Sequence, residues 1–167
     1  MTNAADAESH RALDPGLLRH PAVLVASGFG IGLLRAAPGT FGSAFAVLLA
    51  AAALPAPFAV RCAIGVVLLL CGFLASGAAA RRIGVHDHGG IVIDEIAAMY
   101  LVLLAVPASI PAWLLAFATF RLFDIWKPWP IRDLDHRLSG SAGIMLDDLA
   151  AALYAAVISA MGGWLMA

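Results

Sequence analysis

The chain has 167 residues, of which 62% are hydrophobic and only 13% are charged, and its mean hydropathy is +0.93. A soluble domain carries about a quarter charged residues, so the apolar surplus exceeds what one core can bury, and lipid must cover the rest. The formal net charge of −1 and the lack of a basic run exclude an electrostatic nucleic-acid binder. We therefore expect an integral membrane protein with no nucleic-acid partner.

The N-terminal third of the chain divides at Pro, Gly and charged residues. Residues 1–20 are polar and are expected to form a mobile tail, which leaves 21–167 as a single membrane-embedded domain. The first apolar segment, 21–34, is rich in glycine. The stretch 37–43, Ala-Pro-Gly-Thr-Phe-Gly-Ser, is typical of a loop and leads into a second apolar segment over 43–54.

Longer apolar segments follow. The segment 58–80 is long enough to span a hydrocarbon core of ~30 Å, which needs about 20 helical residues. Apolar residues resume over 91–123, with an interruption at 106–111, and the last apolar segment runs from 149 to 167. Because open sheet edges are not tolerated in lipid, this order predicts an all-α fold, a polytopic membrane helical bundle.

The stretch 91–123 has two interpretations. One long helix would place Asp94 and Asp124 on opposite faces of the membrane, whereas a hairpin that turns between Pro107 and Pro111 would return Asp124 to the face that holds Asp94. Two prolines four residues apart favour the turn, although a kinked helix is an alternative. The hairpin also gathers the cations on one side, which we expect to be cytoplasmic; they are Arg81, Arg82, Lys127, Arg132 and Arg137.

Five carboxylates stand beside aliphatic segments, where an ionised group is costly unless it is paired or binds a metal. They are Asp94, Glu95, Asp124, Asp147 and Asp148. If gathered, they would repel one another, and a divalent cation would compensate their charge. Oxygen ligands of this kind suit Mg²⁺, which also binds substrate phosphate. The alternative is that each pair only stabilises a helix N-terminus at the membrane boundary.

The other candidates would contact a phosphate. In the stretch 37–43, Gly39 allows backbone N–H groups to turn toward an anion, and Thr40 or Ser43 can donate a hydroxyl or simply cap the next helix. Lys127 follows Asp124 among prolines and tryptophans, either as an interfacial anchor or as a cation that neutralises a phosphoryl group. His86 and His88 are expected to be solvated rather than to bind a metal. These candidates favour hydrolysis of a phosphate ester by a metal-activated water, with carboxylates as the metal ligands.

Four motifs in order resemble bacterial phosphatidylglycerophosphatase A, over about residues 22 to 160. They are Gly28-Phe29-Gly30 through Ala37-Pro38-Gly39-Thr40-Phe41-Gly42-Ser43, then Ile91-Val92-Ile93-Asp94-Glu95, then Phe120-Arg121-Leu122-Phe123-Asp124-Ile125-Trp126-Lys127-Pro128-Trp129-Pro130-Ile131, and Gly143-Ile144-Met145-Leu146-Asp147-Asp148. The family often carries a cation just ahead of Ala-Pro-Gly, and here that cation, Arg35, is displaced by one residue.

The resemblance implies a magnesium-dependent enzyme of the bacterial inner membrane that hydrolyses phosphatidylglycerophosphate to phosphatidylglycerol, with its active site facing the cytoplasm. Carried over by motif, the catalytic or metal residues are Asp94, Glu95, Asp124 and Asp148, with Asp147 adjacent, and the phosphate contacts are Thr40 and Lys127.

Two other functions stay open from the residues. The first is a phosphatase of another lipid or isoprenoid phosphate, which only substrate profiling separates from the main hypothesis. The second is a non-enzymatic membrane subunit whose acidic residues line a cation path. A path would place carboxylates at several depths of the bilayer, whereas a phosphatase would gather them at one interface.

Overall fold

The computed structural model describes residues 12–85, 88–129, 131–133 and 140–165, and these contain helices without any strand. The all-α prediction is therefore confirmed over this part of the chain. The elements are η1 (Pro15–Arg19), α2 (Pro21–Ala26), η2 (Ile31–Leu33), α3 (Pro38–Ala53), α4 (Phe58–Ile83), α5 (Ile93–Ala105), α6 (Ile110–Trp126) and α8 (Gly140–Leu165).

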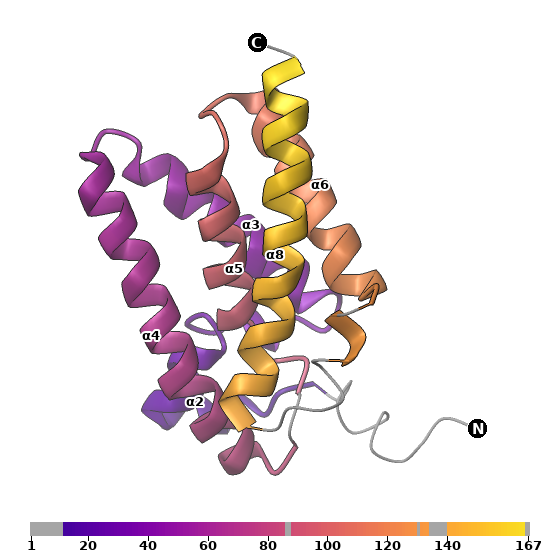
Figure 1. Cartoon of the computed structure of the whole chain (residues 1–167). Coiled ribbons are helices and arrows are strands. Elements are labelled where there is room, and N and C mark those ends of the chain that lie inside the picture. Colours follow the sequence, from indigo (N-terminus) through magenta and orange to yellow (C-terminus); the bar gives the residue numbers. More distant parts are fainter. Residues whose placement is uncertain (1–11, 86–87, 130, 134–139, 166–167) are drawn as a thin grey trace.

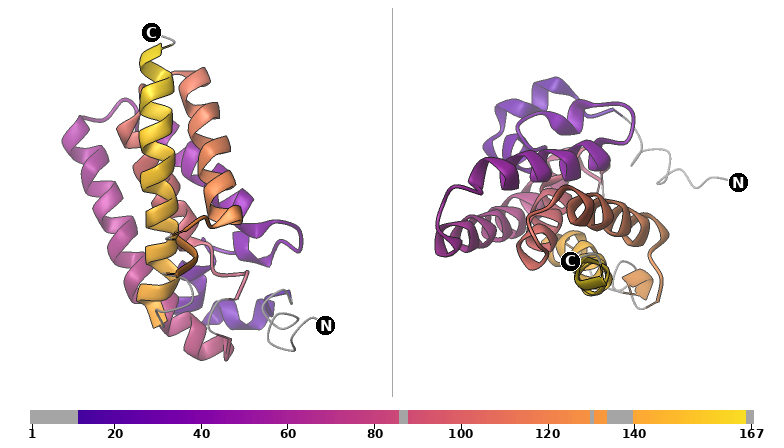
Figure 2. Two further views of the ribbon diagram at one scale, coloured as in Figure 1. Left: turned by 45° about the vertical axis from the view of Figure 1, so that its right-hand side comes forward. Right: turned by 90° about the horizontal axis from the view of Figure 1, so that it is seen from above.

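Helix α5 lies at the centre of the bundle, in contact with α3, α4, α6 and α8 (Figures 1 and 2). Most of its residues are buried, including the fully buried Met99 and Tyr100. The helices alternate in direction, so α3, α5 and α8 begin at the end of the bundle where α4 and α6 finish (Figure 1). We call this the polar end, because the buried acidic residues lie there.

The α5–α6 hairpin is confirmed. Helix α5 stops at Ala105, and Val106 is extended. The Ser109 side chain then accepts a hydrogen bond from the Ala112 N–H at 3.4 Å and caps α6. A proline in the first turn of α6 costs no hydrogen bond, because its N–H would have no partner inside the helix. The chain therefore turns at the predicted prolines, and Asp124 returns to the polar end.

Two described helices are long and apolar enough to cross a membrane, Phe58–Ile83 and 140–162, and Pro38–Ala53 is apolar but shorter. Along α4, large aliphatic side chains such as Leu70 and Leu74 are exposed. Exposed aliphatic residues on a long apolar helix fit contact with lipid rather than water.

Two predicted boundaries are wrong. Helix α3 begins at Pro38 instead of 43, because proline is well suited to the first helical position even though Pro-Gly suggests a loop. Helix α8 begins at Gly140 instead of 149. Asp147 and Asp148, which precede the predicted apolar segment, are both buried inside the bundle as part of this helix.

The first apolar segment is also divided differently. It forms two short helices, α2 and η2, separated by Gly28, Phe29 and Gly30, all with left-handed backbone angles. In the described part of the expected tail, Leu13 is buried against α2 and α4. Residues 1–11 lie outside the described part of the chain.

Segments α2 and η2 contact the connection that enters α5 and hold it in place. The Val92 N–H donates to the Ala26 carbonyl at 2.8 Å. Gly32 lies so close to the Gly90 backbone that a Cβ on Gly32 would be 2.0 Å from the Gly90 carbonyl oxygen. This close approach fixes the start of α5, which carries Asp94.

Gly32→Ala should therefore destabilise the protein, since the added methyl group would displace backbone rather than a side chain. We expect the free energy of unfolding to fall by more than about 2 kcal/mol. The midpoint of thermal unfolding in detergent measures the effect. Gly16→Ala is the matched control, because Gly16 is exposed and its Cβ would meet only the Asp14 side chain. Equal midpoints for the two variants would contradict the close packing at Gly32.

Candidate active site

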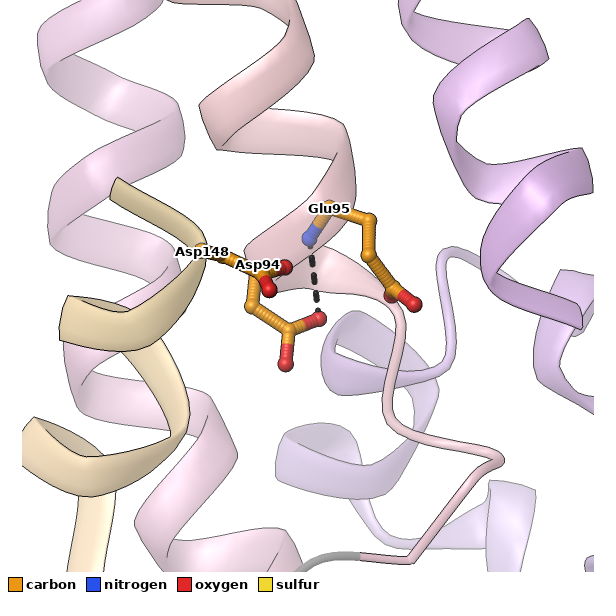
Figure 3. Close-up of side chains that lie close together, drawn as sticks. All are labelled: Asp94, Glu95 and Asp148. Atoms are coloured by element: carbon orange, nitrogen blue, oxygen red, sulfur yellow. Dashed lines mark hydrogen bonds between the residues drawn. The ribbon is translucent and has the colours of Figure 1, made fainter. Parts of the chain in front are cut away.

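Asp94 and Glu95 stand in the first turn of α5, where a carboxylate also stabilises the helix dipole. The Asp94 carboxylate accepts a hydrogen bond from the Glu95 N–H at 3.0 Å (Figure 3). Asp94 is buried, and the Glu95 side chain is only 16% exposed. The turn that enters α5 thus places two adjacent carboxylates inside the protein.

Asp148 of α8 completes a group of three carboxylates. One oxygen from each of Asp94, Glu95 and Asp148 lies within 4.8 Å of the other two (Figure 3). Among the described residues, the buried Glu95 Oε2 and Asp148 Oδ2 have no hydrogen-bond partner. Such atoms are costly to bury, and a bound cation could compensate them.

Asp124, near the end of α6, joins the group through Arg121. The Arg121 guanidinium forms a short hydrogen bond with the Asp124 carboxylate and an ion pair with Glu95 Oε1 at 3.7 Å. Asp124 and Asp148 also lie near enough to Glu95 for their charges to act on it. One guanidinium therefore faces several carboxylates, and the group keeps an excess of negative charge.

Arg121 was not among the predicted site residues. Its signal was present, since Arg121 is the single cation of the apolar segment 110–123 and stands one helical turn before Asp124. A charge inside an apolar helix that is one turn from a carboxylate predicts an ion pair at the protein interior.

Asp147 points to a different partner. Its Oδ2 accepts a hydrogen bond from Lys127 Nζ at 2.6 Å, and Asp147 is not part of the group of three carboxylates. Lys127 has a left-handed backbone at the C-terminus of α6, where Pro128 prevents the helix from continuing. The lysine predicted to neutralise a phosphoryl group beside Asp124 is thus paired with the carboxylate next to Asp148.

The start of α3 packs against the carboxylates. A Cβ on Gly39 would be 1.8 Å from Glu95 Oε1, so only glycine permits this approach. Ser43 is fully buried, and its hydroxyl donates to the Gly39 carbonyl at 2.9 Å and accepts from Arg121 at 3.5 Å. Ser43 therefore supports Arg121, while Thr40 is partly exposed in the same helical turn.

A polar cavity of about 340 Å³ opens beside Glu95 and Arg121. Its wall is formed by the turn before α3, the start of α3, the Gly89-Gly90 turn and Arg35. Arg35, whose position departs from the family pattern, thus stands over the same cavity as Arg121. Two guanidinium groups and a helix N-terminus make this cavity suitable for an anion.

The carboxylate group fits a hard divalent cation. All three candidate ligands offer oxygen, and oxygen-only sites suit Mg²⁺, Ca²⁺ or Mn²⁺ rather than softer metals. The two buried oxygens without partners would gain ligation in place of a missing hydrogen bond. Asp94, Glu95 and Asp148 are therefore the residues that could hold a metal.

His88 is buried instead of solvated, which corrects the prediction for this residue. Its Nδ1 accepts a hydrogen bond from the Gly90 N–H at 2.9 Å, so the imidazole stabilises the turn before α5. His86 lies outside the described residues.

Comparisons with known proteins agree on one family. The family described as phosphatidylglycerophosphatase A matches residues 24–162. A phosphatidylglycerophosphatase A of Haemophilus influenzae is 41% identical over 84% of this chain and 88% of its own length, and one of Escherichia coli is 38% identical over 84% and 83%.

A third relative, from Bacteroides thetaiotaomicron, is 33% identical over 86% of this chain and 94% of its own length, and carries a provisional name as a phosphatidylinositol-3-phosphatase. No solved structure matches the chain. The family match and the two relatives cover most of the chain, so the chain belongs to the phosphatidylglycerophosphatase A family.

Proposed function

We propose that this protein removes the terminal phosphate of phosphatidylglycerophosphate and releases phosphatidylglycerol, as a step of phospholipid synthesis. The observation that carries the proposal is the meeting of Asp94, Glu95 and Asp148 beside a cavity that contains Arg121. In a member of this family, an anion pocket next to a cation site is the arrangement that phosphate-ester hydrolysis needs.

The metal in this proposal is Mg²⁺, held by Asp94, Glu95 and Asp148, with Asp124 beside them. When bound, Mg²⁺ supplies positive charge and activates water for attack on phosphorus. A carboxylate of the group accepts the proton of the attacking water. Asp124 holds the Arg121 guanidinium in place, and the Lys127–Asp147 ion pair fixes the turn of α8 that presents Asp148.

The substrate phosphate would lie in the cavity, where Arg121 donates hydrogen bonds to it and the N-terminus of α3 adds the positive end of its dipole. Arg35, an exposed residue, lines the same cavity and would also contact the phosphate. Thr40, in the first turn of α3, and Lys127, at the end of α6, do not line this cavity. They remain proposed contacts of the phosphate, and Lys127 would share its charge between Asp147 and the phosphate. Gly39 would contribute to the site by allowing α3 to pack closely against Glu95, and Ser43 would contribute by orienting the Arg121 side chain.

We place the polar end at the cytoplasmic face of the bacterial inner membrane. Arg81 and Arg82 end α4 there, as expected from the excess of cations on cytoplasmic segments. Trp126 and Trp129 are exposed at the same end, at the level where tryptophan meets lipid headgroups. The phosphoryl group of a membrane lipid would then reach the cavity without leaving the interface.

Of the two alternatives, the cation path is disfavoured, because the carboxylates of α5, α6 and α8 meet at one end of the bundle instead of at several depths. A lipid phosphate with another headgroup is the second candidate. The name of the Bacteroides thetaiotaomicron relative favours it, and substrate profiling decides between the two headgroups.

Phosphate release from a panel of lipids tests the proposal directly. The panel contains phosphatidylglycerophosphate, phosphatidic acid, phosphatidylinositol 3-phosphate and an isoprenyl phosphate in detergent micelles. With Mg²⁺ we expect phosphatidylglycerophosphate to be hydrolysed at least about tenfold faster than the others, because the cavity must also accept the glycerol headgroup. A chelator should stop the reaction, and added Mg²⁺ should restore it.

Asp94→Asn should lower this rate by at least about a hundredfold while the protein stays folded and monodisperse, since the change removes the ligand charge but keeps the shape. Asp14→Asn makes the same chemical change at an exposed carboxylate and should leave the rate unchanged. Full activity of Asp94→Asn, or full activity in chelator, would contradict the proposed site.

Arg121→Lys should raise KM for phosphatidylglycerophosphate and lower kcat/KM by about tenfold to a hundredfold. Lysine keeps the charge but loses the planar fork that reaches Glu95, Asp124 and the phosphate together. Arg132→Lys, the same change at an exposed arginine of the polar end, is the control. Steady-state kinetics of both variants suffice, and equal values would argue against a phosphate role for Arg121.

A further inference from the structure

An apolar groove of about 460 Å³ follows the outer surface between α3 and α6. Its wall contains aliphatic and aromatic side chains from both helices; they are Ala44, Val47, Leu48, Ile110, Trp113, Leu114 and Phe117. The carboxylate site does not use this groove, and a lipid-covered groove of such size offers room for a hydrocarbon chain.

The groove and the polar cavity belong to the same two helices. The cavity is lined by Gly39 of α3 and Arg121 of α6. The groove begins about one helical turn farther from the polar end on each helix, at Ala44 of α3 and Phe117 of α6. Between them lies Ser43, whose hydroxyl meets Arg121. A molecule with a charged end at Arg121 would therefore have its apolar part directed into the groove.

The length of the groove agrees with this arrangement. Ile110 and Arg121 are separated by eleven residues of helix, which corresponds to about 16 Å at a rise of ~1.5 Å per residue. One leaflet of a bilayer has a hydrocarbon depth of about 15 Å. The far end of the groove at Ile110 thus lies about as far from Arg121 as one acyl chain reaches into the bilayer.

We propose that the groove between α3 and α6 binds an acyl chain of the lipid phosphate substrate while the phosphate occupies the cavity at Arg121. The inference rests on the proposed phosphatase function and adds to it a site for the lipid tail. Since lipid tails surround the protein everywhere, the groove selects by shape and not by a hydrophobic driving force.

A second apolar groove provides the comparison. It lies between α5 and α8, has a volume of about 220 Å³ and includes Ala156 in its wall. No residue of α8 lines the polar cavity in the described part of the chain, so this groove lacks the continuity that α3 and α6 provide. Ala44 and Ala156 are both partly buried alanines in apolar grooves, which makes them a matched pair.

The experiment measures kcat/KM of Ala44→Phe and Ala156→Phe for dipalmitoyl and dihexanoyl phosphatidylglycerophosphate. Ala44→Phe fills the groove, so we expect a loss of about tenfold for the dipalmitoyl lipid and less than about twofold for the dihexanoyl lipid. Ala156→Phe should leave the ratio of the two values unchanged. The groove assignment is overturned if the dipalmitoyl-to-dihexanoyl ratio of kcat/KM changes only in Ala156→Phe, or if it changes in neither variant.

Photolabelling of the unmodified protein provides a second measurement that does not depend on a variant folding. A phosphatidylglycerophosphate with a diazirine on one acyl chain should label peptides of α3 and α6, and excess unlabelled substrate, but not phosphatidylethanolamine, should prevent it. Labelling confined to α5 and α8 would overturn the proposal. Failure of the unmodified protein to release phosphate from either lipid would instead overturn the proposed function, and the acyl site with it.

Discussion

The burial of several carboxylates beside a single guanidinium is the constraint on which the structure depends. Asp94, Glu95, Asp124 and Asp148 come from three helices, and Arg121 is paired with Glu95 and Asp124. Each buried ion costs several kcal/mol unless it is compensated, so such a group is stable with a bound cation or in a partly protonated form. The excess negative charge that opposes folding is what makes the site suitable for a divalent metal.

The rest of the fold places these charges at one end of the bundle and buries them. The α5–α6 hairpin brings Asp124 back to Asp94, and the contact of Gly32 with Gly90 fixes the entry into α5. Glycine at position 39 allows α3 to touch Glu95 directly. Away from the polar end the helices present exposed aliphatic side chains, so the same helices combine a polar site with an apolar surface.

The sequence was sufficient for the helical fold, the hairpin and the carboxylates, because hydrophobic segments, paired prolines and charges beside aliphatic residues are local signals. It was insufficient for contacts that depend on packing. The Pro-Gly stretch before Thr40 resembled a loop, yet it starts a helix whose glycine packs against Glu95. The pairing of Lys127 with Asp147 required knowing how α6 and α8 meet, and the ion pair of Arg121 with Glu95 required knowing how α6 meets α5.

The most direct test of a shared cation between two helices is the binding of Mn²⁺, a paramagnetic substitute for Mg²⁺, measured by electron paramagnetic resonance on the detergent-solubilised protein. We expect tight binding that weakens by at least about tenfold in Asp94→Asn and also in Asp148→Asn, because in the proposed site α5 and α8 both supply ligands. Asp14→Asn should bind as the unmodified protein does. Unchanged binding in Asp148→Asn, or no binding to the unmodified protein, would contradict a shared cation.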